Sequence, residues 1–245
     1  MEPIFRMTQT VEAIHVDPFQ RLKPSAVLYF AQEAAGQHCV ELGLDWETLA
    51  ARNICWVLAK QRVKITRLPM CGETITIETW PMPTGNTHYP RATVAYDQEG
   101  KELFSVHGIW VLMNFKTRGM ILPGKSDLSL AGIQRGNEIQ APGNFRVTEF
   151  RHQMTRTVRY SELDRNGHMN NTRYIDWVAD LLPGEFHKTH PFNTISVWYS
   201  SEALEGEELT LQWMLDGSVL HVVAHRSKTD VSDKKERVFA AQVAL

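Results

Sequence analysis

A short motif recurs in this chain at a fixed distance, and that recurrence constrains the fold more than any other feature. Residues 72–77 read Gly-Glu-Thr-Ile-Thr-Ile and residues 206–211 read Gly-Glu-Glu-Leu-Thr-Leu, an offset of 134 positions. The same offset aligns further segments: Lys101-Glu102 with Lys235-Glu236, and Val63 and Ile65 with Val197 and Tyr199. A constant offset across three separate segments predicts that the chain contains two copies of one structural unit.

Each copy reads as one helix followed by several strands. A helix is predicted over residues 25–43, because Pro24 suits its first turn and Gly43 its end. Apolar or small residues recur along one face of this helix: Val27, Phe30, Ala31, Ala34, Ala35 and His38. A second helix is predicted from the spacing of Tyr174, Trp177, Val178 and Leu181, and Pro183-Gly184 ends it.

The strands complete the predicted fold. Strands are expected at 56–67, 74–80, 89–97 and 102–114, and again at 194–201, 208–215, 219–225 and 237–244. One helix against a mostly antiparallel sheet, present twice, is typical of a tandem hotdog protein. We therefore predict an α+β fold in which two hotdog domains form one continuous antiparallel sheet with two central helices. The expected boundaries are 1–122 for the first domain, 123–144 for a linker rich in Gly, Ser, Pro and Asn, and 145–245 for the second.

Composition excludes several classes of protein. The chain has 245 residues, of which 43% are hydrophobic and 22% charged, so a disordered chain is excluded. The formal net charge of −2 argues against bulk nucleic-acid binding. Cys39, Cys55 and Cys71 are too few and too far apart for a disulfide scaffold. No stretch approaches the roughly 20 apolar residues that span a bilayer, and residues 1–10 do not resemble a secretory signal. We expect a mature, soluble, cytoplasmic protein.

The densest group of polar residues, at positions 160–172, lies between a strand and the second helix. Asp164, Asn166 and His168 alternate in sequence, so an extended segment would place all three side chains on one side. Gly167 permits a close turn, and Asn170 or Asn171 could cap the helix that follows. A carboxylate, an amide and an imidazole beside a helix N-terminus suit the transfer of an acyl group to water. The alternative is that these residues only make a turn and cap a helix.

A family resemblance favours the catalytic interpretation. The run Glu162-Leu-Asp164-Arg-Asn166-Gly-His168-Met-Asn170-Asn171-Thr-Arg-Tyr174-Ile-Asp176-Trp177 closely resembles the signature of acyl-ACP thioesterases, which are tandem-hotdog enzymes of plants and bacteria. The first copy also matches the family, at Gln32-Glu33-Ala34-Ala35, Gly72-Glu73 and Trp110-Val-Leu-Met-Asn114. The resemblance implies a catalytic loop of Asp164, Asn166 and His168.

One departure from the family bears on the mechanism. The family places a Tyr-x-x-Glu-Cys run after the second helix, and here that run is Tyr199-Ser-Ser-Glu202-Ala203. Glu202 keeps the carboxylate, but Ala203 stands where plant members have cysteine, and the second copy contains no cysteine at all. A cysteine nucleophile is therefore impossible there, and we expect the chemistry to run through carboxylates.

The resemblance implies hydrolysis of fatty acyl-ACP to free fatty acid and ACP, ending fatty acid synthesis, with no cofactor and no metal. We expect Asp164 to act as general base or nucleophile and Asn166 to position substrate or water. His168 with Glu202 would orient and activate the water. The first copy would enclose the acyl chain, since its matching segment, Asp17-Pro-Phe-Gln-Arg-Leu-Lys-Pro24, has no Asn-x-His.

Three other functions remain open. An acyl-CoA thioesterase would differ only in the carrier, a hotdog hydratase would not need Glu202, and a non-catalytic acyl-binding protein would not need an intact Asp-Asn-His loop. A homodimer is also possible, beyond the pairing of the two copies within the chain.

Two further patterns have simpler explanations. His187-x-x-His190 has no third ligand nearby, so we expect no metal there. A basic run with only Glu149 opposing it consists of Arg146, Arg151, Arg156 and Arg159. This run is expected to be a solvated strand face, and the alternative is that it steers the acidic carrier protein.

Overall fold

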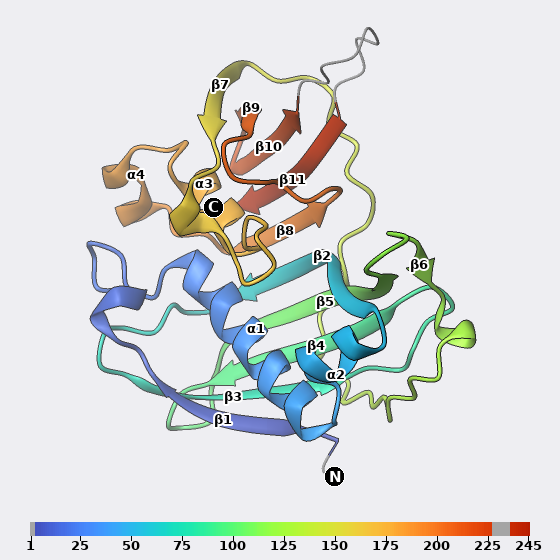
Figure 1. The fold of residues 1–245 in the computed structure, drawn as a ribbon. Coiled ribbons are helices and arrows are strands. Elements are labelled where there is room, and N and C mark those ends of the chain that lie inside the picture. The colour runs from blue at the N-terminus through green and yellow to red at the C-terminus, as the bar shows by residue number, and fades with distance from the viewer. Residues whose placement is uncertain (1–2, 227–235) are drawn as a thin grey trace, which may run out of the picture. The chain divides into compact units, whose positions relative to one another are not determined.

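The computed structural model describes residues 3–226 and 236–245, and the chain divides into two compact units, Met1–Ala141 and Pro142–Leu245. Within the described residues, each unit contains an antiparallel sheet with a helix against it (Figure 1). No helix among the described residues is long and apolar enough to cross a membrane.

The first unit builds its sheet from the N-terminal half of the chain. Its strands pair in the order β1 (Phe5–Thr10), β3 (Thr74–Pro81), β4 (Tyr89–Tyr96), β5 (Glu102–Asn114) and β2 (Ile54–Ile65), and the short β6 (Met120–Ile121) pairs with β5. The helix α1 (Pro24–Glu41) lies across this sheet (Figure 1). Four strands were predicted to within two residues at each end, whereas β1 and the short helix α2 (Trp46–Ala51) were not expected.

The helix α1 follows the sequence prediction closely. Pro24 occupies its first turn, and Gly43 just after it has a φ of +67°, a conformation that glycine adopts without steric cost. Every residue of the predicted apolar face is buried: Val27, Phe30, Ala31, Ala34, Ala35 and His38. The small alanines on this face let the helix approach the sheet closely, as the pattern predicted.

The second unit repeats the arrangement with shorter helices. Its strands pair in the order β8 (Thr194–Tyr199), β11 (Glu236–Ala244), β10 (Val219–Arg226), β9 (Glu208–Asp216) and β7 (His152–Thr157). The helix α3 (Arg173–Ala179) packs the ring of Tyr174 at 4.7 Å from Phe239 on the sheet. A second short helix, α4 (Gly184–Thr189), was not expected from the sequence.

The sequence offset is preserved in the structure. The strands β3 and β9 begin at Thr74 and Glu208, which keeps the offset of 134. Glu102, at the start of β5, aligns with Glu236, the first described residue of β11, since Lys235 lies outside the described residues. The segment after the Gly-Glu motif is therefore a strand in both units.

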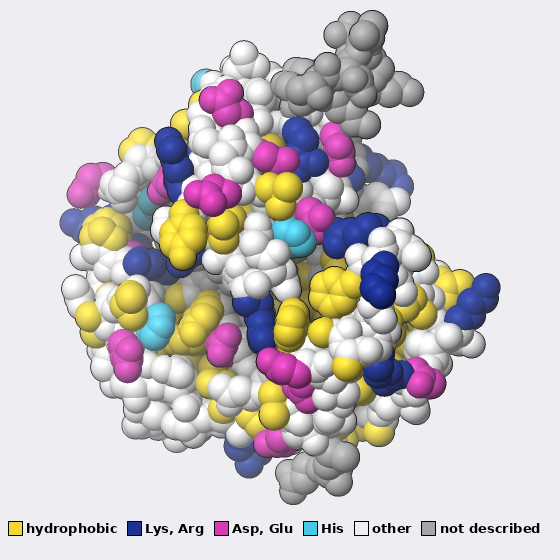
Figure 2. Space-filling model, in the orientation of Figure 1, with side chains coloured by type: hydrophobic (Ala, Val, Ile, Leu, Met, Phe, Trp, Pro, Cys, Tyr) yellow, Lys and Arg dark blue, Asp and Glu magenta, His cyan; other side chains and the backbone are white. Residues whose placement is uncertain are grey.

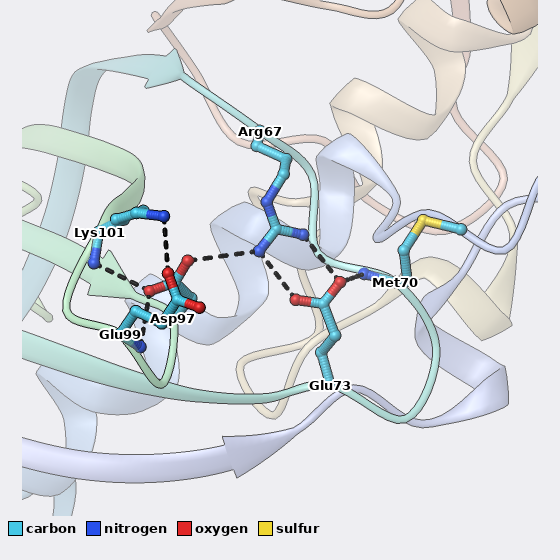
Figure 3. A network of polar contacts seen from close by, with 6 residues as sticks. All are labelled: Arg67, Met70, Glu73, Asp97, Glu99 and Lys101. Atoms are coloured by element: carbon cyan, nitrogen blue, oxygen red, sulfur yellow. Dashed lines mark hydrogen bonds and ion pairs between the residues drawn. The ribbon is translucent and has the colours of Figure 1, made fainter.

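The Gly-Glu motif recurs because it closes the same turn in each unit. Gly72 and Gly206 have φ values of +86° and +80°. In the first unit, the carboxylate of Glu73 accepts a hydrogen bond from the Met70 N–H at 2.8 Å and pairs with Arg67 at 2.8 Å (Figure 3). The hydrogen bonds from Arg67 hold the pKa of Glu73 below its ordinary value.

The second unit makes this turn with a different arginine. The carboxylate of Glu207 accepts a hydrogen bond from the Leu204 N–H at 3.1 Å, as Glu73 does from Met70. Its cationic partner is Arg226, at 2.7 Å, at the end of β10. The turn is therefore conserved between the units while the strand that supplies the arginine changes.

Much of the predicted linker, 123–144, packs against the sheets. In the first unit, the Ile133 N–H donates to the carbonyl of Pro81 at 3.0 Å, and the Trp80 indole donates to Glu138 at 3.3 Å. In the second unit, the Trp198 indole donates to the carbonyl of Gly143 at 2.7 Å. These bonds satisfy the polar end of each buried indole, so this segment helps to cover each sheet.

Candidate active site

The polar cluster at residues 163–169 forms a tight turn. Leu163 pairs with Met169 in an antiparallel bridge, and the Asp164 N–H donates to the carbonyl of His168 at 2.8 Å. Gly167 has a φ of +76°, which a glycine adopts without steric cost. The expectation of an extended segment is therefore wrong, because the chain reverses direction between Asp164 and His168.

The turn brings together the three residues that were expected to share one side of a strand. The Oδ1 atom of Asp164 accepts hydrogen bonds from the backbone N–H groups of Asn166, at 2.8 Å, and His168, at 3.3 Å. Its Oδ2 atom lies 3.5 Å from the amide nitrogen of Asn166. Oδ1 of Asp164 thus stabilises the turn, and Oδ2 faces the side-chain amide of Asn166.

Glu202 approaches this turn from a distant part of the sequence. Its Oε2 atom lies 3.2 Å from Nδ1 of His168, with the two side chains 37% and 28% exposed. Backbone contacts hold the approach, since the Met169 N–H donates to the carbonyl of Ala203 at 2.8 Å and His168 forms a bridge with Leu204. The structure therefore places all four predicted site residues in one partly exposed location.

Buried groups support the site from behind. Tyr174 is almost fully buried, and burial raises the pKa of its phenol. The carboxylate of Glu162 accepts hydrogen bonds from the Trp177 indole, at 2.5 Å, and from the Arg159 N–H, at 2.8 Å. The spacing of Tyr174 and Trp177 predicted the helix on which they lie. Spacing did not predict the bond between Trp177 and Glu162, because it joins separate segments of the chain.

The helix after the turn contributes less than expected. Asn170 accepts hydrogen bonds from the N–H and the hydroxyl of Thr172, both at 2.9 Å. The N-cap residue of α3 is Thr172, without a side-chain capping bond, so the expectation that Asn170 or Asn171 caps this helix is wrong. The helix α3 spans only seven residues, so its dipole is small. We therefore assign no stabilisation of negative charge to this helix end.

The pair of Glu202 and His168 has the arrangement of a general base with its orienting carboxylate. A carboxylate beside Nδ1 favours the tautomer with a proton on that nitrogen, which leaves Nε2 able to accept a proton from water. Asp164 and Asn166 add an anionic oxygen and an amide within the same turn. Such a set can activate water and orient a carbonyl compound for attack.

The cysteines of this chain all belong to the first unit, as Cys39, Cys55 and Cys71. Ala203, which stands where the family has cysteine, is fully buried. His187 hydrogen-bonds through Nε2 with the carbonyl of Ala179 at 3.0 Å. Among the described residues, no group of three His, Cys, Asp or Glu side chains is arranged to hold a metal ion.

The basic run does not form one strand face as expected, because only Arg156 lies on a strand, β7. Arg156 on β7 pairs with Asp180 at 2.7 Å and lies over the Trp177 ring at 4.8 Å. Arg146, Arg151 and Arg159 are exposed. On the face that Figure 2 shows, acidic and basic side chains are interspersed, with no broad surface of one sign.

Two family models match most of the chain. The acyl-ACP thioesterase N-terminal domain matches residues 2–122, and the acyl-ACP thioesterase C-terminal domain matches residues 146–238. A dodecanoyl-[acyl-carrier-protein] hydrolase of Cinnamomum camphora is 26% identical over 81% of this chain and 56% of its own length. A palmitoyl-acyl carrier protein thioesterase of Cuphea hookeriana is 25% identical over 85% of this chain and 54% of its own. The chain thus spans about half the length of these two chloroplastic relatives.

Solved structures resemble this one along nearly its whole length. An acyl-ACP thioesterase from Bacteroides thetaiotaomicron superposes with a TM-score of 0.87 and 26% identity, covering 99% of this chain and 97% of the other. A 12:0-ACP thioesterase from Umbellularia californica gives a TM-score of 0.80 at 22% identity, covering 98% and 93%. These similarities confirm the predicted fold class of two hotdog domains, each with its helix and antiparallel sheet.

Proposed function

Because this chain belongs to the acyl-ACP thioesterase family, we propose that it hydrolyses the thioester of fatty acyl-ACP to free fatty acid and ACP. The observation that carries the proposal is the pair of Glu202 and His168, 3.2 Å apart, beside the turn that holds Asp164 and Asn166. The reaction would end fatty acid synthesis in the cytoplasm.

The residues of the site have the following proposed roles. Asp164 acts through Oδ2 as a general base or as a nucleophile, because Oδ1 is occupied by two backbone N–H groups. Asn166 positions the substrate or the water. Glu202 orients His168, which takes the proton of the attacking water at Nε2. In the direct route, water adds to the carbonyl carbon, the C–S bond breaks, and the departing thiolate receives the proton. In the nucleophile route, Oδ2 of Asp164 adds to the carbonyl carbon and the C–S bond breaks; the water activated by His168 then cleaves the acyl–aspartate anhydride, and the proton passes to the thiolate.

A thioester suits this limited set of groups. Its carbonyl is only weakly stabilised by resonance, and a thiolate leaves readily, so neither a metal ion nor a cofactor is required. The first unit would hold the acyl chain, because its corresponding loop at residues 16–22 contains no histidine. The exposed Arg146, Arg151 and Arg159 would favour approach of an acidic carrier protein.

The alternative carrier is coenzyme A. The thioester and the chemistry are the same for both carriers, so the four site residues serve either reaction. The names of the relatives specify acyl carrier protein, which favours that carrier here. A hydratase acting on a double bond would not require Glu202 beside His168.

The test is to assay the purified protein on acyl-ACP substrates from octanoyl to stearoyl and on the matching acyl-CoA series, measuring free fatty acid and free thiol. We expect the higher kcat/KM on acyl-ACP. Glu202→Ala is the control, and it should lose most of the turnover while remaining folded. Release of no fatty acid from any acyl-ACP would contradict the proposal, and a clear preference for acyl-CoA would reassign the carrier.

A further inference from the structure

Arg226 joins the site to the strand behind it. This residue ends β10, and its side chain is three-quarters buried. Its Nη2 donates to the main-chain carbonyl of Glu202 at 2.5 Å and to the carboxylate of Glu207 at 2.7 Å. Its Nη1 lies 3.7 Å from the carboxylate of Glu236 on β11. The guanidinium therefore connects Glu202 to the Gly-Glu turn and to the edge of β11.

The backbone is held by hydrogen bonds on both sides of Glu202. Before Glu202, the N–H groups of Ser200 and Ser201 donate to the carbonyl of Val238. After it, the carbonyl of Ala203 accepts from the Met169 N–H. The peptide group that begins at the Glu202 carbonyl is fixed by Arg226. Because this peptide sets the direction of the Glu202 side chain, the guanidinium can determine whether the carboxylate faces His168.

The first unit shows that this contact is not needed to close the turn. There the Gly-Glu turn uses Arg67, and the offset of 134 aligns Arg67 with Ser201, not with Arg226. The residue that aligns with Glu202 is Leu68, which has no carboxylate to orient. In the second unit the arginine comes from β10, and it contacts the backbone of the residue that carries the site carboxylate.

We propose that Arg226 is a positioning residue that holds the Glu202 backbone so that the Glu202 carboxylate faces Nδ1 of His168. The expected effect on kcat rests on the proposed function, whereas the expected effect on the orientation of the Glu202 carboxylate does not. A misplacement of about 1 Å in a catalytic group can lower turnover by about 100-fold. Arg226 therefore acts on kcat through Glu202 and has no contact with the substrate in this role.

The kinetic test compares Arg226→Gln and Arg226→Lys with Arg67→Gln, which removes the equivalent ion pair of the first unit. We expect Arg226→Gln to lower kcat by about 10- to 100-fold with little change in KM. Arg226→Lys keeps the charge without the planar guanidinium, so it should restore part of the lost turnover. Arg67→Gln should lower the melting temperature without lowering kcat.

A second measurement does not depend on turnover. Imidazole nitrogen NMR reports which nitrogen of His168 carries the proton, and Glu202→Ala identifies the signal that responds to the carboxylate. We expect Arg226→Gln and Arg226→Lys to move this signal toward its position in Glu202→Ala, and Arg67→Gln to leave it unchanged. If Arg226→Gln does not fold, Arg226→Lys carries both measurements.

The outcomes separate this inference from the proposed function. The positioning role is overturned if the Arg226 variants keep the wild-type kcat and His168 signal, or if Arg67→Gln causes equal losses of turnover. A wild-type protein that hydrolyses no acyl-ACP, but whose His168 signal moves in the Arg226 variants, would contradict the proposed function and leave the positioning role intact.

Discussion

The turn at residues 163–169 of the second unit has a close counterpart at residues 16–22 of the first. In each, an aspartate N–H donates to a carbonyl four residues later: Asp17 to Arg21 at 2.7 Å, and Asp164 to His168 at 2.8 Å. Asp17 also accepts two backbone hydrogen bonds through Oδ1, from Phe19 and Arg21, as Asp164 does. The backbone of the candidate catalytic loop is therefore a structural device that both units use.

The two turns differ in what their side chains do. In the first unit, the guanidinium of Arg21 returns to Asp17 at 2.9 Å and closes an ion pair within the turn. In the second unit, His168 occupies the corresponding position and faces Glu202 instead. The two turns thus share a backbone arrangement and differ in the contacts of their side chains. The comparison also means that the structural and catalytic interpretations of Asp164 are compatible.

The strongest test of this comparison replaces His168 and its counterpart Arg21 by alanine, each in its own variant. His168→Ala should lower kcat on acyl-ACP by about 100- to 10,000-fold, because it removes the group that moves the proton. Arg21→Ala, its counterpart, should leave kcat within about twofold, since removing an ion pair from a partly exposed turn affects mainly stability. If both folded variants lost the same fraction of turnover, the first turn could not be structural while the second is catalytic.

A smaller effect is expected for the aspartate that both turns share. Asparagine retains an oxygen that can accept the two backbone hydrogen bonds, so Asp164→Asn and Asp17→Asn should both fold. If Oδ2 of Asp164 is the base or nucleophile, Asp164→Asn should lower kcat by about 100-fold, whereas Asp17→Asn should not. Steady-state kinetics with melting temperatures measures both effects. Wild-type turnover in Asp164→Asn would restrict Asp164 to the structural role of Asp17.

The smallest effect concerns the backbone of the two turns. Gly167 and Gln20 have φ values of +76° and +65°, and no atom lies within 4 Å of a Cβ added at Gly167. Gly167→Ala should therefore cost only backbone strain, about 1–2 kcal/mol, seen as a lower melting temperature. Gln20→Gly should shift the melting temperature upward by less, because glycine also gains entropy in the unfolded chain. If Gly167→Ala and Gln20→Gly shifted the melting temperature in the same direction, the two turns would not be equivalent.

Features with a local cause were predictable from the sequence. The helix α1 follows from Pro24, Gly43 and a repeated apolar face, and the strand β5 was predicted at its observed limits, Glu102–Asn114. The strand β1 was missed because it is an edge strand whose inward residues are only half-buried, so its sequence lacks a strong apolar alternation. The helices α2 and α4 were missed because each spans only six residues.

By itself, the sequence predicted the duplication, most of the strands and one helix of each unit, because repeats and periodicity are patterns of the sequence itself. Its resemblance to a family supplied the four candidate site residues. Only the tertiary structure decided how the site residues meet. It turned residues 163–169 back on themselves, so that Asp164 closes a turn. It also brought Glu202 to His168 and Arg226 to the Glu202 backbone. These contacts join distant segments through strand pairing, and their register is set by packing of the whole sheet.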